Sequence, residues 1–188
     1  ILDCEFTVDI GWPIIGNVYT CRFTPILTGN DNVVEDVQGD HLSGKGNADV
    51  QALTVYLRNF PKIPKDITKF FKNLTVLRWL NSSMASITAE DLRPFPELRV
   101  LVLAYNDLTT IDANLFRYTP KLGNINLNYN KIENVGRNAF ESLTQLATLL
   151  FDDNRCSFKR AVNRTQVLNL LPQIAADCPP VRLSNRTV

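Results

Sequence analysis

The sequence predicts an α/β solenoid, in which short parallel strands line the concave face of a horseshoe and a disulfide-closed cap covers each end. Three observations lead to this prediction. A hydrophobic pattern returns every 24 residues, an asparagine recurs at one position of that pattern, and four cysteines flank the repeats in two groups. A single repeat of this size cannot bury its own apolar face, so the repeats must stack on one another.

The repeat is clearest at 98–108, where LRVLVLAYNDL fits the form L-x-x-L-x-L-x-x-N-x-L. The segment 122–132, LGNINLNYNKI, fits the same form, and 122 − 98 gives a period of 24 residues. A further step reaches 146–156, and steps backward reach 74–84 and 50–60. The apolar positions are kept in all five segments, so the pattern is not a chance match.

The first, fourth and sixth positions of each repeat are expected to point into the solenoid; the fourth and sixth share a face because side chains alternate along a strand. The asparagine that follows the strand carries an amide that can pair with otherwise unsatisfied backbone groups in the turn. We therefore expect Asn106, Asn130 and Asn154 to form a buried ladder with a structural role, and not to bind a ligand.

Four cysteines allow three disulfide pairings. Two strand-like segments around a Gly-Trp-Pro turn predict a hairpin closed by Cys4 and Cys21. Cys156 ends the last repeat, and a helix over 167–171 is expected to cover the open core before Cys178. Because the repeats separate the two ends, we expect the pairs Cys4–Cys21 and Cys156–Cys178. A zinc site is disfavoured, since no Cys-x-x-Cys pair exists.

These features divide the chain into four parts. Residues 1–49 form an N-terminal cap with the hairpin and an irregular first repeat, and residues 50–156 form the leucine-rich repeats. Residues 157–178 form a helical C-terminal cap, and residues 179–188 form a tail.

The charge balance gives no electrostatic case for nucleic acid or an acidic membrane as a general partner. Lys and Arg number 20 against 19 Asp and Glu, so the net charge of +1 gives no electrostatic reason to bind nucleic acid. No apolar run reaches the roughly 18 residues that a membrane-spanning helix needs, so the chain is not expected to be transmembrane.

Several features predict a secreted, extracellular glycoprotein. The chain begins with Ile1 rather than Met, as expected when a signal peptide has been removed. The cysteine count is even, as in many disulfide-stabilised extracellular proteins. Four Asn-x-Ser/Thr sequons begin at Asn73, Asn81, Asn163 and Asn185.

The sequence contains no recognisable catalytic constellation, and we expect a binding module rather than an enzyme, without cofactor or metal. His41 is the only histidine and belongs to no nucleophile–base motif. The segment 39–45 resembles the start of a phosphate-binding loop, but Gly46 stands where Ser or Thr must hold magnesium.

The strand positions between the core residues should line the concave face, and the first rows of this face are unusually apolar. A contiguous apolar patch commonly marks an interaction site, and tyrosines are frequent at interface hot spots. We expect a partner to contact Tyr56, Leu57, Val76, Arg78, Leu80, Val100, Val102, Tyr105, Asn126, Tyr129 and Leu150.

Two alternatives remain open at this stage. A cap, a neighbouring subunit or a glycan at Asn81 could shield the apolar rows. A second candidate surface consists of lysines that would share one convex face if the segment is helical, and it could bind glycans or acidic lipid. These lysines are Lys62, Lys65, Lys69 and Lys72.

Three local motifs carry a family resemblance: Cys-x-Phe and Tyr-x-Cys near the N-terminus, GKGNAD at 44–49, and FFKNL at 70–74. With the repeats, they resemble small secreted leucine-rich-repeat proteins of insects. The chain is similar to the repeat region of mosquito leucine-rich immune proteins and, more distantly, to Toll-receptor ectodomains. That family's long C-terminal coiled coil is absent from this sequence.

The resemblance implies an extracellular recognition role, with innate immunity as its setting and a protein, glycan or lipid as the partner. Two other functions fit the same sequence. The chain could be a structural or matrix protein that assembles with itself as a homo-oligomer, or it could be a carrier or inhibitor of an extracellular ligand.

The sequons give a first testable prediction. We expect glycans at Asn73 and Asn163 when a eukaryotic host secretes the protein, because both sequons should lie in exposed loops or cap surfaces. Intact mass before and after glycosidase treatment measures the occupancy. A mass that does not change would contradict the prediction.

Overall fold

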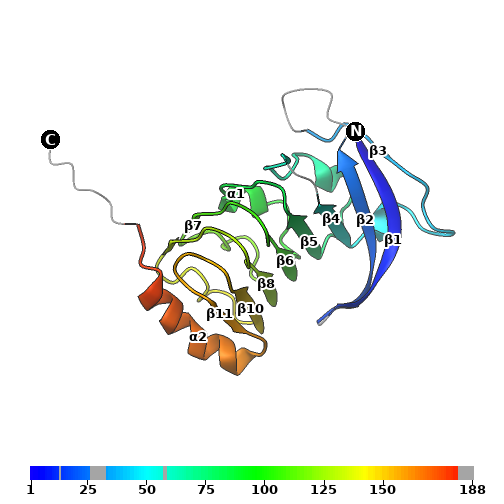
Figure 1. The fold of residues 1–188 in the computed structure, drawn as a ribbon. Coiled ribbons are helices and arrows are strands. Elements are labelled where there is room, and N and C mark those ends of the chain that lie inside the picture. The colour runs from blue at the N-terminus through cyan, green and yellow to red at the C-terminus, as the bar shows by residue number, and fades with distance from the viewer. Residues whose placement is uncertain (13, 26–32, 57–58, 182–188) are drawn as a thin grey trace.

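The computed structural model describes residues 1–12, 14–25, 33–56 and 59–181, and within them the chain winds as a solenoid (Figure 1). Each 24-residue repeat contributes one strand to a shared parallel sheet. These strands are β4 (Ala52–Tyr56), β5 (Val76–Leu80), β6 (Val100–Val102), β8 (Asn124–Asn126) and β10 (Thr148–Phe151). The predicted solenoid of 24-residue repeats is thereby confirmed.

The strands pair in the register that the repeat predicts. Leu53, Leu77, Leu101, Ile125 and Leu149 lie opposite one another in successive strands. All five side chains are fully buried in the solenoid. Because one face of each strand points into this core, the other face forms the concave surface.

The sheet continues past the repeats at both ends. The added strands are β1 (Leu2–Trp12), β2 (Gly16–Pro25), β3 (Val37–Gln38) and β11 (Lys159–Ala161). β1 and β2 form an antiparallel hairpin, and β2 pairs in parallel with β4. Cys21 stands opposite Leu53, so β2 occupies the place of the first repeat strand.

The convex side is built from short elements. They are β7 (Thr110–Ile111), β9 (Asn134–Val135), α1 (Ala89–Leu92) and two short 3₁₀ helices at Asn47–Asp49 and Ile67–Lys69. Thr88 caps α1 by accepting a hydrogen bond from the backbone of Asp91. The 3₁₀ turn at Ile67–Lys69 contains only one of the four convex lysines, so these lysines do not share one helical face.

The predicted asparagine ladder is confirmed. The side-chain amide of Asn130 donates to the carbonyl oxygens of Leu103 in the preceding turn at 2.9 Å and Leu127 in its own turn at 3.0 Å. Its side-chain oxygen accepts from the backbone N–H of Leu108 at 3.1 Å. Asn106 and Asn154 make the same set of bonds one turn before and one turn after.

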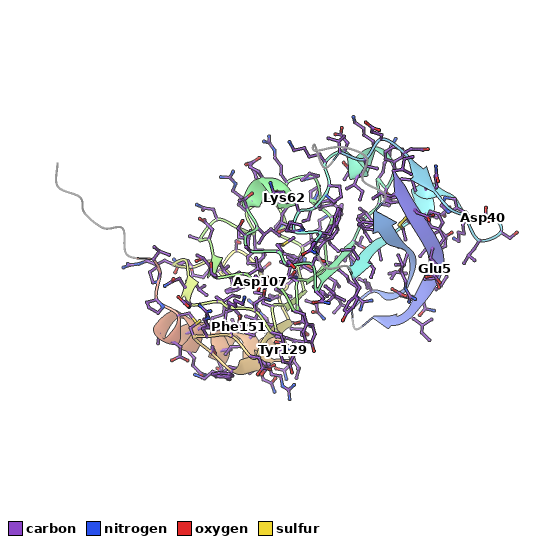
Figure 2. The ribbon with its side chains drawn as sticks, turned by 45° about the horizontal axis from the view of Figure 1, so that its top comes forward. Glu5, Asp40, Lys62, Asp107, Tyr129 and Phe151 are labelled. Atoms are coloured by element: carbon purple, nitrogen blue, oxygen red, sulfur yellow. A yellow bond between two sulfur atoms is a disulfide. The ribbon has the colours of Figure 1, made fainter. Side chains whose placement is uncertain are left out.

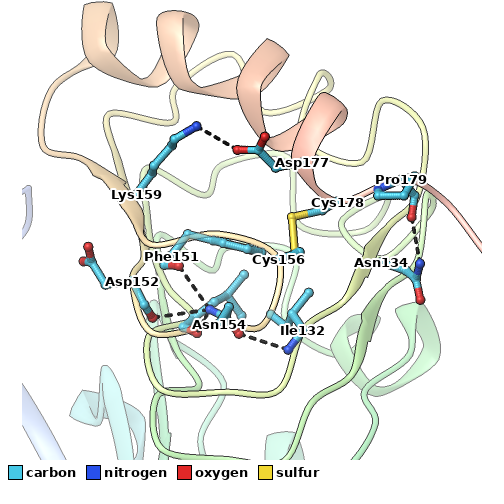
Figure 3. The surroundings of a disulfide bond; sticks show 11 residues. Ile132, Asn134, Phe151, Asp152, Asn154, Cys156, Lys159, Asp177, Cys178 and Pro179 are labelled. Carbon is cyan, nitrogen blue, oxygen red and sulfur yellow. Dashed lines mark hydrogen bonds and ion pairs between the residues drawn. A yellow bond between two sulfur atoms is a disulfide. The ribbon is translucent and has the colours of Figure 1, made fainter.

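The C-terminal cap closes the last turn (Figure 3). Helix α2 (Arg164–Asp177) covers the core with Val167, Leu170 and Ile174, which are buried. Asn163 caps this helix by accepting a hydrogen bond from the backbone of Gln166 at 2.9 Å.

Both predicted disulfides form in the structure. Cys156 joins Cys178 at the end of α2, and Cys4 joins Cys21 across the N-terminal hairpin. Each bridge therefore closes one cap and leaves the repeats between them free of cross-links. The pairing follows the placement of the cysteines on either side of the stack.

The His41 side chain is held in place by contacts with its neighbours and has a structural role. Its ring stacks on Phe6 with 3.8 Å between ring centroids, and its two nitrogens contact the Tyr19 hydroxyl at 3.0 Å and the Asn47 side chain at 2.9 Å. The backbone N–H of Leu42 donates to the same hydroxyl. The segment around His41 is thus fastened against the N-terminal hairpin.

Candidate functional site

The N-terminal hairpin bends over part of the concave face (Figure 1). Thr20 pairs with Ala52, so the hairpin residues before Thr20 extend past the start of the parallel strands. Ile15, near the hairpin turn, packs on an apolar cluster that belongs to the concave face. The members of this cluster are Val18, Ala52, Val76, Val100, Val102 and Ala104.

The tip of the hairpin reaches as far as the turn that precedes β8. A Cβ atom added at Gly123 would lie 2.8 Å from the Cδ1 atom of Ile14, which is closer than carbon atoms can approach. The end of the Ile14 side chain therefore lies directly against the backbone of this turn.

The hairpin over these strands contradicts one expectation from the sequence, namely that the apolar rows of the concave face are open to a partner. Val76 and Val100 are 0% exposed and Val102 is 8% exposed, so these apolar rows are not an open surface. Strands of 11 and 10 residues make the hairpin long enough to act as a lid as well as an end cap. Shielding by a cap, one of the alternatives left open above, is what occurs.

A buried carboxylate fastens the hairpin to the sheet. Asp9 of β1 is 8% exposed, and its side chain lies 2.5 Å from Arg22 of β2 and 3.8 Å from Arg78 of β5. Burial lowers the pKa of the Arg78 guanidinium, and the charge of Asp9 opposes that effect. Arg78, which was expected to contact a partner, therefore helps to hold the hairpin against the sheet.

The open part of the concave side is a row of residues that follows the strands. It consists of Asn81, Tyr105, Tyr129 and Asp153, which we call the rim; successive members are 24 residues apart. Each has a positive φ between 51° and 59°, because the chain turns sharply there. Figure 2 shows Tyr129 at the edge of the solenoid and Phe151 inside it.

The two rim tyrosines form an exposed stack. Their rings are nearly parallel, with an interplanar angle of 7° and 4.5 Å between centroids. Tyr105 is 52% exposed and Tyr129 is 46% exposed. The separation is close to the spacing of neighbouring strands, so the stack is a consequence of the repeat.

The charge beside this stack is negative. The negative charge of Asp153 and, after it, the neighbouring Tyr105 raise the pKa of the Tyr129 phenol. Asp152 lies one residue earlier, with Arg160 at 4.0 Å. The rim therefore combines an aromatic surface with a carboxylate.

The remaining predicted contact residues differ in accessibility. Tyr56 is exposed, whereas Leu80, Asn126 and Leu150 are half-buried. Leu57 lies outside the described residues.

The asparagines of the four sequons also differ in how exposed they are. Asn73 and Asn163 are exposed and Asn81 is half-buried, while Asn185 lies outside the described residues. The side chain of Asn73 donates to the carbonyl of Ala48 at 2.7 Å.

Sequence reasoning missed Asp9 and Ile15, which hold the hairpin over the concave face. One signal was available, because Ile14 and Ile15 place two large apolar side chains beside a turn. Apolar residues at a hairpin turn indicate that the turn packs against something.

Two kinds of site are absent from the described part of the chain. No group of three or more His, Cys, Asp or Glu side chains there could hold a metal ion. No helix among the same residues is long and apolar enough to cross a membrane.

Comparison with known proteins agrees with this architecture. Residues 96–155 match the leucine rich repeat family model. The fold is a leucine-rich-repeat solenoid. No curated protein matches the chain.

Two solved structures have a similar fold. The structure of the Drosophila Toll–Spätzle complex aligns with a TM-score of 0.53 and 15% identity over 57% of this chain and 14% of that one. A leucine-rich-repeat protein of Leptospira interrogans aligns with a TM-score of 0.50 and 21% identity over 59% and 28%. The chain thus spans less than a third of either structure's length, and these likenesses concern the fold alone.

The hairpin lid gives a second testable prediction. We expect Ile15→Ser to loosen the hairpin and to lower the free energy of unfolding by about 1–2 kcal/mol, because it removes part of an apolar contact. Chemical denaturation measures the loss, and an apolar fluorescent dye reports exposure of the Val76 and Val100 row. Ile10→Ser is the control, since Ile10 is 79% exposed. Equal behaviour of the two variants would contradict the lid.

Proposed function

We propose that this chain is a secreted recognition protein that binds an extracellular protein partner through the rim and the open concave positions beside it. The observation that carries the proposal is the exposed stack of Tyr105 and Tyr129 on a rigid solenoid. Tyrosines at such positions supply large contact areas at low entropic cost, and they are enriched among interface hot spots. Tyr56, Leu80, Asn126 and Leu150 complete the proposed surface.

The compartment is part of the same proposal. Two disulfides close the caps, and structural disulfides persist in oxidising environments such as the extracellular space. Exposed sequons at Asn73 and Asn163 suit a glycoprotein that has passed through the secretory pathway.

An immune role and an insect origin are the finer part of the proposal. Toll, whose complex with Spätzle is described as a molecular hub in Drosophila development and innate immunity, has a similar fold. The resemblance to small secreted insect leucine-rich-repeat proteins points in the same direction. Shared fold does not fix a partner, so this part rests on the resemblance.

The hairpin narrows the surface that a partner can reach. Val76, Val100 and Val102 lie beneath it, so a partner that leaves the hairpin in place contacts the rim first. Protein partners fit this surface better than acidic lipid or sulfated glycan, because the carboxylate of Asp153 repels anions.

Site-specific photo-cross-linking tests the proposal. A photoreactive phenylalanine analogue replaces Tyr129 in one variant and Tyr118, on the convex side, in the control. We expect a discrete adduct with one other protein of the extracellular fluid from position 129 and none from position 118. An adduct with the mass of two copies of the chain would favour the self-assembling matrix protein instead, and adducts from position 118 alone would overturn the proposal.

A further inference from the structure

The convex side of the protein contains a complete arginine site made of one tyrosine and one carboxylate. The guanidinium carbon of Arg117 lies 4.5 Å from the ring centroid of Tyr118, and that of Arg93 lies 5.4 Å away. Glu90 accepts hydrogen bonds from Arg117 at 2.6 Å, from Arg93 at 3.2 Å and from the Tyr118 hydroxyl at 3.3 Å. In this cluster a carboxylate and the face of an aromatic ring hold two guanidinium groups, and the phenol hydroxyl donates to the same carboxylate.

The rim contains the same kinds of group, an aromatic face and a carboxylate. Asp153 stands one repeat after Tyr129, in the adjoining turn, where the backbone N–H of Tyr129 donates to the carbonyl of Asp152 at 3.0 Å, so a carboxylate adjoins the ring as Glu90 adjoins Tyr118. Tyr105 adds a second ring, stacked on the first at 4.5 Å. Within the described part of the chain, no ion pair joins Asp153 to a cation and no arginine or lysine lies over either ring.

We propose that Tyr105, Tyr129 and Asp153 form the docking point for an arginine side chain of the partner protein. This inference rests on the proposed function and adds to it the chemistry of the residue that the partner presents. The site is complete on this chain except for the cation.

Charge and ring geometry favour a guanidinium over other groups. A cation within about 6 Å of an aromatic face is attracted by the negative charge of the π system. Arginine is planar, so it can lie flat on a ring and direct its N–H groups at a carboxylate, which the compact ammonium of lysine cannot do. Among the described residues, Arg160 pairs with Asp152 at 4.0 Å and makes no ion pair with Asp153 and no cation–π contact with either rim tyrosine.

The titration of the rim is in accord with this assignment. On the convex side the hydrogen bonds from Arg117 and Arg93 lower the pKa of Glu90. On the rim, the negative charge of Asp153 raises the pKa of Tyr129. A bound guanidinium would offset that negative charge and lower the Tyr129 pKa toward its ordinary value.

The experiment uses the whole chain with ¹³C-labelled tyrosine rings and small probes in place of the partner. N-acetyl-arginine amide is titrated in, followed by the lysine amide and by the citrulline amide, which has nearly the shape of arginine without its charge. We expect arginine amide to shift the Tyr105 and Tyr129 signals in a saturable way, lysine amide to bind several-fold more weakly, and citrulline amide to bind least.

Matched variants locate the binding. Tyr105→Asn removes one ring and keeps a residue that tolerates a positive φ, as Asn81 does one turn earlier. Asp153→Asn removes the charge and keeps the shape. We expect each to weaken arginine amide binding about fivefold, the factor that about 1 kcal/mol represents. Asp107→Asn is the control, because Asp107 is already paired with Lys131 at 2.5 Å.

Three results would overturn the inference: equal binding of arginine and citrulline amides, shifts confined to Tyr118, or no effect of Asp153→Asn. These results can be told apart from failure of the proposed function. A rim cross-link to a partner together with no arginine binding would reject the arginine site alone, whereas arginine binding without any rim cross-link would reject the proposed function and leave the site.

Discussion

The asparagine ladder is the interaction on which the rest of this structure depends. Turns that follow a strand leave backbone N–H and C=O groups without partners in regular secondary structure, and burying them unpaired is costly. Asn106, Asn130 and Asn154 satisfy these groups between neighbouring turns through one amide each. The ladder therefore fixes both the shape of each turn and its distance from the next.

A regular stack repeats every position at the strand spacing, and this explains the rim. Tyr105 and Tyr129 each directly precede a ladder asparagine, so their rings are brought face to face by the same repeat that aligns the core leucines. The position of the hairpin, in contrast, does not follow from the repeat. It is irregular, lies outside the repeat, and covers the apolar rows that the repeat would otherwise leave open, with Ile15 as its contact.

The sequence was informative where structure follows from local pattern. The register of Leu101 with Ile125, the role of Asn130 and the two disulfide pairs all follow from a 24-residue period and from where the cysteines stand. The covered state of Val100 could not be predicted in the same way. It depends on how far and in which direction a hairpin bends, which is decided by contacts such as that between Ile14 and Gly123, far apart in the sequence.

The stability of Asn130→Ala tests the central role of the ladder most directly. The variant leaves the buried N–H of Leu108 without its side-chain partner, at a cost of about 1–3 kcal/mol. It also removes one of the two amide donors from each of the carbonyls of Leu103 and Leu127, which keep Asn106 and Asn154, and each lost hydrogen bond costs about 1 kcal/mol more. Chemical denaturation should show a loss of about 3 kcal/mol or more, against a change within about 0.5 kcal/mol for Asn169→Ala on the exposed face of α2. A loss for Asn130→Ala no larger than that of Asn169→Ala would contradict the account.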